Sequence, residues 1–201
     1  MMQLALMGLV SLLSSRWVAE PTAVPVVRPI TEAETVLAIM RHDFRLASTS
    51  PSFSVILVIW PDGHTVWSGD CRRGGPPYYS GQIEPQVVAA LLARFDSEEL
   101  FSIGTVNAPS LYVDAEFIRV LVKAGKKKMS MQSSHELLDH AGVAALRKKS
   151  AEYLFYRTVW SETRARLAEL IPHDRNVASG KPVMEGGVLA WHEGADQPFK
   201  P

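Results

Sequence analysis

The chain has 201 residues and a formal net charge of zero, with 47% hydrophobic and 21% charged residues. This composition excludes a wholly disordered chain, and the length fits one domain of about 150 residues with appendages. The balanced charge argues against a protein that coats nucleic acid, because such proteins carry a basic excess. A single cysteine excludes an internal disulfide and a zinc ribbon.

The first 19 residues contain an apolar run, Leu4–Leu13. A bilayer-spanning helix needs about 20 residues, so no integral membrane span is expected. The run has the length of the apolar part of a secretory signal, about 7 to 15 residues. The sequence therefore predicts a signal peptide over 1–19 and a periplasmic or secreted location. The alternative is a buried N-terminal helix in a cytoplasmic protein.

Proline spacing and the apolar pattern predict the domain boundaries. Pro21, Pro25 and Pro29 fall within ten residues, which forbids a regular helix and predicts an extended linker over 20–34. A single domain is expected over 35–171. Residues 172–201 are expected to form a C-terminal extension that is partly disordered.

The domain begins with predicted strands. Thr35–Met40 is apolar and fits either a strand or the end of a helix. Phe53–Trp60 is β-branched and almost wholly apolar, which predicts a central strand covered on both faces. Pro61-Asp62-Gly63 has turn chemistry, so Thr65–Ser68 is expected to pair back as a hairpin. Asp70–Gln82, rich in glycine and proline, is expected to be a loop.

A helix and a second hairpin follow. Glu84–Phe95 has apolar residues at three- and four-residue spacing and a proline in its first turn, which predicts an amphipathic helix. Phe117–Ala124 alternates between apolar and basic residues and is expected to pair with Lys127–Gln132. Further apolar spacing predicts a long helix over about 143–171, and Gly186–Trp191 is a candidate last strand.

Hairpins dominate this order of elements, and no alternation of strands with crossover helices is present. The sequence therefore predicts an α+β fold with an antiparallel sheet, helices packed on one face and a long C-terminal helix. The absence of such alternation argues against a parallel nucleotide-binding sheet, and no cofactor-binding motif occurs.

Short motifs in the first hairpin carry a resemblance. Pro51-Ser52-Phe53, Asp62-Gly63 and Val66-Trp67-Ser68-Gly69 resemble a small bacterial domain family of unknown function, often found in exported proteins. That family has a Cys-Pro-x-Tyr strand, an Asp-Gly hairpin, a helix and a second hairpin. Ser50 stands in place of its cysteine and Phe53 in place of its tyrosine. The resemblance implies a fold and an envelope location but no activity.

Two segments are candidates for binding. The first mixes cations, aromatic rings and a glycine-rich backbone, a combination that can bind nucleic acid or carbohydrate. The second is a lysine cluster at the predicted tip of the second hairpin, which could contact phosphate or another anion. The residues are Arg72, Arg73, Tyr78 and Tyr79 in the first segment and Lys126, Lys127 and Lys128 in the second.

A metal site is the weaker alternative. His135, Asp139 and His140 lie in one predicted helix, but the two histidines are five residues apart. A zinc-binding H-E-x-x-H motif needs a spacing of four, so that both imidazoles share one helix face. His135 and Asp139 could ligate a metal only with a third ligand, such as His173 or His192.

Three functional hypotheses follow. The leading one is a non-enzymatic exported domain that acts as a binding or interaction module, with another envelope protein or an anionic ligand as partner. The second is a metal-dependent hydrolase that uses the His135/Asp139/His140 segment. The third is a cytoplasmic protein that contacts nucleic acid through Arg119–Lys149, where eight lysines and arginines face two acids.

Overall fold

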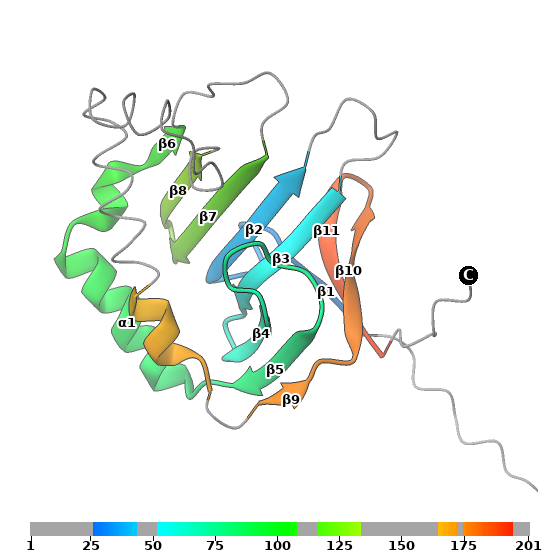
Figure 1. Ribbon diagram of the computed structural model, residues 1–201. Coiled ribbons are helices and arrows are strands. Elements are labelled where there is room, and N and C mark those ends of the chain that lie inside the picture. The colour runs from blue at the N-terminus through cyan, green and yellow to red at the C-terminus, as the bar shows by residue number, and fades with distance from the viewer. Residues whose placement is uncertain (1–25, 44–51, 108–115, 134–164, 173–174, 195–201) are drawn as a thin grey trace, which may run out of the picture.

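A computed structural model describes residues 26–43, 52–107, 116–133, 165–172 and 175–194, which form two packed sheets flanked by helix (Figure 1). The first half contains strands β1 (Val27–Pro29), β2 (Leu37–Asp43), β3 (Ser52–Ile59), β4 (His64–Ser68) and β5 (Tyr78–Gln82), then helix α1 (Pro85–Ser97) and the 3₁₀ helix η1 (Leu100–Ile103). The second half contains strands β6 (Thr105–Asn107), β7 (Phe117–Ala124), β8 (Lys127–Ser133), β9 (Asn176–Val177), β10 (Gly180–Glu185) and β11 (Val188–Glu193).

The larger sheet has eight strands in the order β6-β8-β7-β2-β3-β4-β5-β9. All neighbouring pairs are antiparallel except β6 and β8, which are parallel. This confirms the predicted antiparallel sheet and its two hairpins. The predicted loop Asp70–Gln82 is shorter, because its last five residues form β5 against β4.

Strands β2 and β3 lie at the centre of this sheet and are buried on both faces. Their pairing contains a β-bulge: Ile39 lies opposite Leu57 and Met40 lies opposite Val55, so Ile56 has no direct partner in the ladder. An extra residue of this kind shifts the alternation of side chains along the strand. Ile56 and Leu57 therefore belong to the same core.

One face of the large sheet packs against helix, as predicted. Val88, Leu91 and Phe95 of α1 are buried against the apolar side chains of β2, β3, β7 and β8. Leu167, from the short helical segment 165–170, joins the same core. Pro85 begins α1. A backbone N–H at this position would have no partner within the helix, so proline, which lacks it, is tolerated.

The other face is covered by a second sheet of three strands in the order β1-β11-β10. Figure 1 shows this sheet on the opposite side of the large sheet from α1. Trp191 of β11 and Ile30 after β1 pack in one core with Val58 of β3, with Trp60 just after β3 and with Tyr78 of β5.

This second sheet corrects the expected domain boundaries. Residues 20–34 were expected to be a linker, but Val27–Pro29 pairs with β11 and Ile30 is buried. Residues 172–201 were expected to form a C-terminal extension that is partly disordered; within this range, residues 176–193 supply β9, β10 and β11. Proline at position 29 is compatible with a strand here because β1 lies at the edge of its sheet.

Several predictions fall outside the described residues. These are the signal peptide over 1–19, the long helix except for residues 165–171, and the tail after residue 194. They stay predictions. No helix within the described ranges is long and apolar enough to cross a membrane.

Trp191→Ala tests whether the small sheet is part of the folded core. Trp191 is only 1% exposed, so its removal leaves a large cavity. We expect the free energy of unfolding to fall by about 3–5 kcal/mol in urea titrations. Val177→Ala, at a position that is 75% exposed, is the control and should change little. Equal stability of the two variants would contradict this packing.

Candidate functional site

A cleft of about 240 Å³ opens between the two sheets, beside strand β7. Its walls are mostly apolar and come from both sheets, and its polar groups gather at one side. The lining residues are Ile30, Thr31, Glu32, Met40, His42, Phe53, Arg119, Leu121, Met184, Gly187, Val188 and Leu189.

The turn between β1 and β2 places Glu32 at this cleft. The Thr31 hydroxyl accepts hydrogen bonds from the backbone N–H groups of Ala33 and Glu34, both at 3.3 Å. The Thr31 carbonyl accepts a bond of 2.6 Å from the hydroxyl of buried Thr35. These bonds hold the backbone of the turn that carries Glu32.

Arg119 of β7 and Lys128 of β8 hold the Glu32 carboxylate. The Arg119 Nη2 lies 3.3 Å from Oε1, and the Lys128 Nζ lies 2.9 Å from Oε2. Lys123 lies directly opposite Lys128 in the ladder and so shares this face. The hydrogen bond from Lys128 lowers the pKa of Glu32, and the charges of Arg119 and Lys123 add to this effect.

The arrangement leaves a local excess of positive charge. Arg119, Lys123 and Lys128 carry three positive charges, and Glu32 balances one of them. Like charges directly opposite each other on neighbouring strands are destabilising, and Lys123 and Lys128 are such a pair. A cationic group of this kind on one sheet face is suited to binding an anion.

His42 also lines the cleft and is uncharged at neutral pH. Its ring meets the edge of Phe53, with ring centroids 4.7 Å apart. Burial, reinforced by the charge of Arg119, lowers the pKa of His42 from 6.5 to about 4. The imidazole therefore adds no positive charge to the cleft at neutral pH.

The tip of the β10–β11 hairpin forms another part of the cleft wall. Gly186 and Gly187 both have positive φ, which permits the tight two-residue turn. Met184 and Val188 flank this turn, line the cleft and are 42% and 39% exposed. The cleft thus combines exposed apolar side chains from this hairpin with the ion pair of Glu32 and Arg119.

The structure separates the three lysines of the second hairpin that were predicted to form a binding cluster, Lys126, Lys127 and Lys128. Lys126 lies exposed in the turn. Lys127 binds the Asp96 carboxylate of α1, with Nζ–O distances of 2.5 and 2.6 Å. Lys128 points to the opposite face, towards Glu32. Consecutive side chains of a strand alternate between faces, which separates Lys127 from Lys128.

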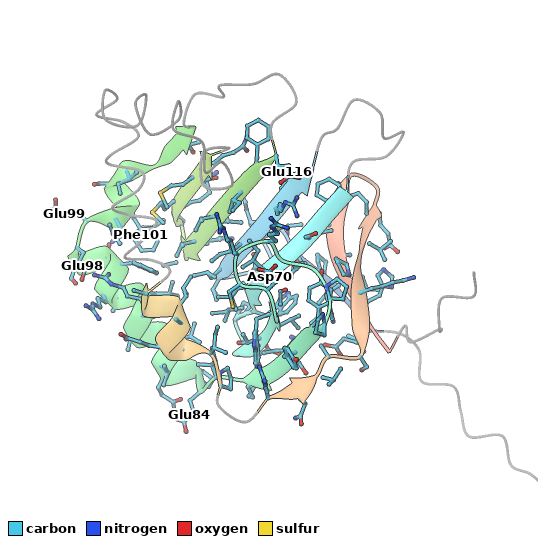
Figure 2. All side chains as sticks on the ribbon, viewed as in Figure 1. Asp70, Glu84, Glu98, Glu99, Phe101 and Glu116 are labelled. Atoms are coloured by element: carbon cyan, nitrogen blue, oxygen red, sulfur yellow. The ribbon has the colours of Figure 1, made fainter. Side chains whose placement is uncertain are left out.

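Arg72 and Arg73 lie in the loop between β4 and β5. Their backbone N–H groups donate to the Asp70 carboxylate at 2.9 Å, and these bonds lower the pKa of Asp70. Figure 2 shows Asp70 in this loop, in front of the central strands. Gly74 has a φ of +74°, and a Cβ there would lie 2.7 Å from the Val55 carbonyl oxygen. Gly74 therefore permits the close packing of the loop on β3.

Tyr78 and Tyr79 point to opposite faces of β5. Tyr78 is 7% exposed, and its ring meets Trp191 edge-on with ring centroids 5.1 Å apart. Tyr79 packs near Trp67 and beneath the guanidinium of Arg175, 4.5 Å from the ring centroid. The structure does not bring either ring together with Arg72 or the lysines.

The predicted metal ligands His135, Asp139, His140 and His173 lie outside the described residues. His192 is described, and its Nε2 lies 2.7 Å from Glu185. In the described part of the chain, no three His, Cys, Asp or Glu side chains converge as a metal-binding group. The metal hypothesis stays a prediction.

Sequence reasoning missed Glu32 and His42 as site residues. Glu32 and Arg119 are 87 residues apart, so no local motif could join them. The available signal was the alternation of Arg119 and Lys123 with apolar residues in β7, which places both on one sheet face. Nothing local indicated that this face would border a cleft.

Comparison with known proteins gives no match: no family model, no curated protein and no solved structure is similar to this chain. The resemblance in the first hairpin therefore stays a prediction.

His42 predicts a pH dependence of stability. Its pKa is lower in the folded than in the unfolded chain, so protonation favours unfolding as the pH falls from about 6.5 to about 4. Allowing for solvent screening, we expect a loss of about 2 kcal/mol from this group. Urea titrations between pH 7.5 and 4 should show a weaker pH dependence in His42→Gln. Identical pH profiles for the two proteins would contradict the assignment.

Proposed function

We propose that this protein is a binding module that takes a small anion in the cleft between its two sheets. The observation that carries the proposal is an apolar cleft lined by Arg119 and Glu32, with Lys123 and Lys128 acting on the Glu32 carboxylate. Ligand sites combine apolar walls with a few convergent polar groups, and this cleft has both.

The enclosed geometry favours a small ligand over a nucleic acid. A nucleic acid is bound along an extended basic surface, whereas the excess here is two charges beside a cleft of about 240 Å³. Arg147, Lys148 and Lys149, which the nucleic-acid hypothesis also needs, lie outside the described residues.

Export remains part of the proposal and rests on the apolar run Leu4–Leu13. A secreted module would meet its ligand in the periplasm or outside the cell. We expect mass spectrometry of the protein from its native cells to find a mature chain that begins near residue 20. An intact Met1 in the cytoplasmic fraction would contradict export and leave the binding proposal untouched.

Arg119→Gln tests anion binding at the cleft. We expect at least one of inorganic phosphate, acetate and hexanoate to shift the backbone NMR signals of residues lining the cleft. The variant should weaken that binding about tenfold, because it removes a charge-assisted hydrogen bond. Binding should also weaken as ionic strength rises.

Arg72→Gln is the matched control, since it removes the same charge from an exposed loop outside the cleft. It should leave the affinity unchanged. Loss of binding in Arg72→Gln, with Arg119→Gln unaffected, would move the site to the loop that the sequence indicated. No shift at the cleft with any of the three anions would overturn the proposal.

A further inference from the structure

The Glu32 side chain already occupies an anion site. Each of its carboxylate oxygens meets one cation, Oε1 with Arg119 and Oε2 with Lys128. The two cations come from neighbouring strands, four positions apart along the ladder, and their long side chains converge on this carboxylate. The protein therefore presents two donors at the separation that one carboxylate spans.

Contact with water makes this internal carboxylate replaceable. The side chains of Glu32, Arg119 and Lys128 are 43%, 35% and 40% exposed. Ion pairs with this much solvent contact contribute little to stability. The backbone of the turn is held by Thr31, so displacing Glu32 requires only rotation of its side chain.

An apolar space adjoins the two cations. Met40, Phe53, Leu121 and Leu189 line the cleft, and Met184 and Val188 form its outer rim. Its volume of about 240 Å³ equals roughly eight water molecules at about 30 Å³ each. That space fits an apolar chain of about six carbon atoms or one aromatic ring.

We infer that the ligand is a carboxylate bearing a short apolar chain, and that Glu32 holds its place between Arg119 and Lys128 until it binds. The ligand carboxylate displaces Glu32, and the chain enters the apolar part of the cleft. Glu32 thereby sets a minimum affinity for binding, because only a ligand that adds apolar contacts outcompetes the tethered carboxylate. This inference rests on the proposed function and names its ligand class.

Isothermal titration calorimetry with hexanoate, acetate and 1-hexanol tests the ligand class. We expect hexanoate to bind at least tenfold more tightly than acetate, which lacks the chain, and than hexanol, which lacks the charge. Met184→Glu should weaken hexanoate binding about tenfold by adding a negative charge to the exposed rim, while Met184→Gln should have a smaller effect.

Glu32→Gln tests the role of the internal carboxylate. Removing the competitor should tighten hexanoate binding about fivefold, since solvent-exposed ion pairs are weak. Glu34→Gln, in the same turn, is the matched control and should leave the affinity unchanged. Circular dichroism would establish that each variant is folded.

The outcomes separate this inference from the proposed function. Weaker or unchanged hexanoate binding in Glu32→Gln overturns the role of Glu32. Hexanoate binding no tighter than acetate, with phosphate bound in an Arg119-dependent manner, overturns the ligand class and leaves the proposed function standing. Absence of binding by all anions overturns both.

Discussion

Strand β3 is buried on both faces, and the rest of the structure follows from the need to cover it. Val55 and Val58 face the small sheet, while Leu57 and Ile59 face α1. Burying each such side chain contributes about 1.5–3 kcal/mol, so neither face can be left to water. The helices cover one face only, and the strands at the two ends of the described chain form the small sheet that covers the other.

The cleft arises because the small sheet of three strands covers only part of one face of the eight-stranded sheet. The small sheet packs over β2 to β5 and over Leu121 of β7, and the same face of β7 and β8 also carries Arg119, Lys123 and Lys128. On their other face these two strands bury Ile118, Val120, Met129 and Met131. An antiparallel sheet with one covered and one open face shows this alternation. The cleft lies at the boundary, where apolar cover ends and cationic side chains begin.

Local patterns were sufficient to predict the elements but not their assembly. Alternation in Phe117–Ala124 predicted which side chains share a face, and apolar spacing predicted α1. The edge strand β1 has three residues ending in proline, so it has no strand pattern of its own. It forms because β11 supplies its hydrogen-bonding partner.

The predicted binding residues illustrate the same limit. Lys127 and Lys128 are adjacent in sequence, but strand alternation sends one to Asp96 and the other to Glu32. Basic residues that are adjacent in sequence are therefore separated in space when they lie in a strand, because consecutive side chains point to opposite faces. Conversely, Glu32 and Arg119 meet only because the turn after β1 reaches the face of β7.

The turn that carries Glu32 links the core to the site. Ile30 donates its backbone N–H to the Leu189 carbonyl at 2.7 Å and buries its side chain in the second core. Two residues later, Glu32 reaches the cations of β7 and β8. The exposed ion pairs contribute little to stability, so the position of this turn is set by apolar burial. The turn that buries Ile30 in the second core therefore also places the Glu32 carboxylate at the cleft. The position of this charge beside Arg119 and Lys128 thus depends on how the two sheets pack.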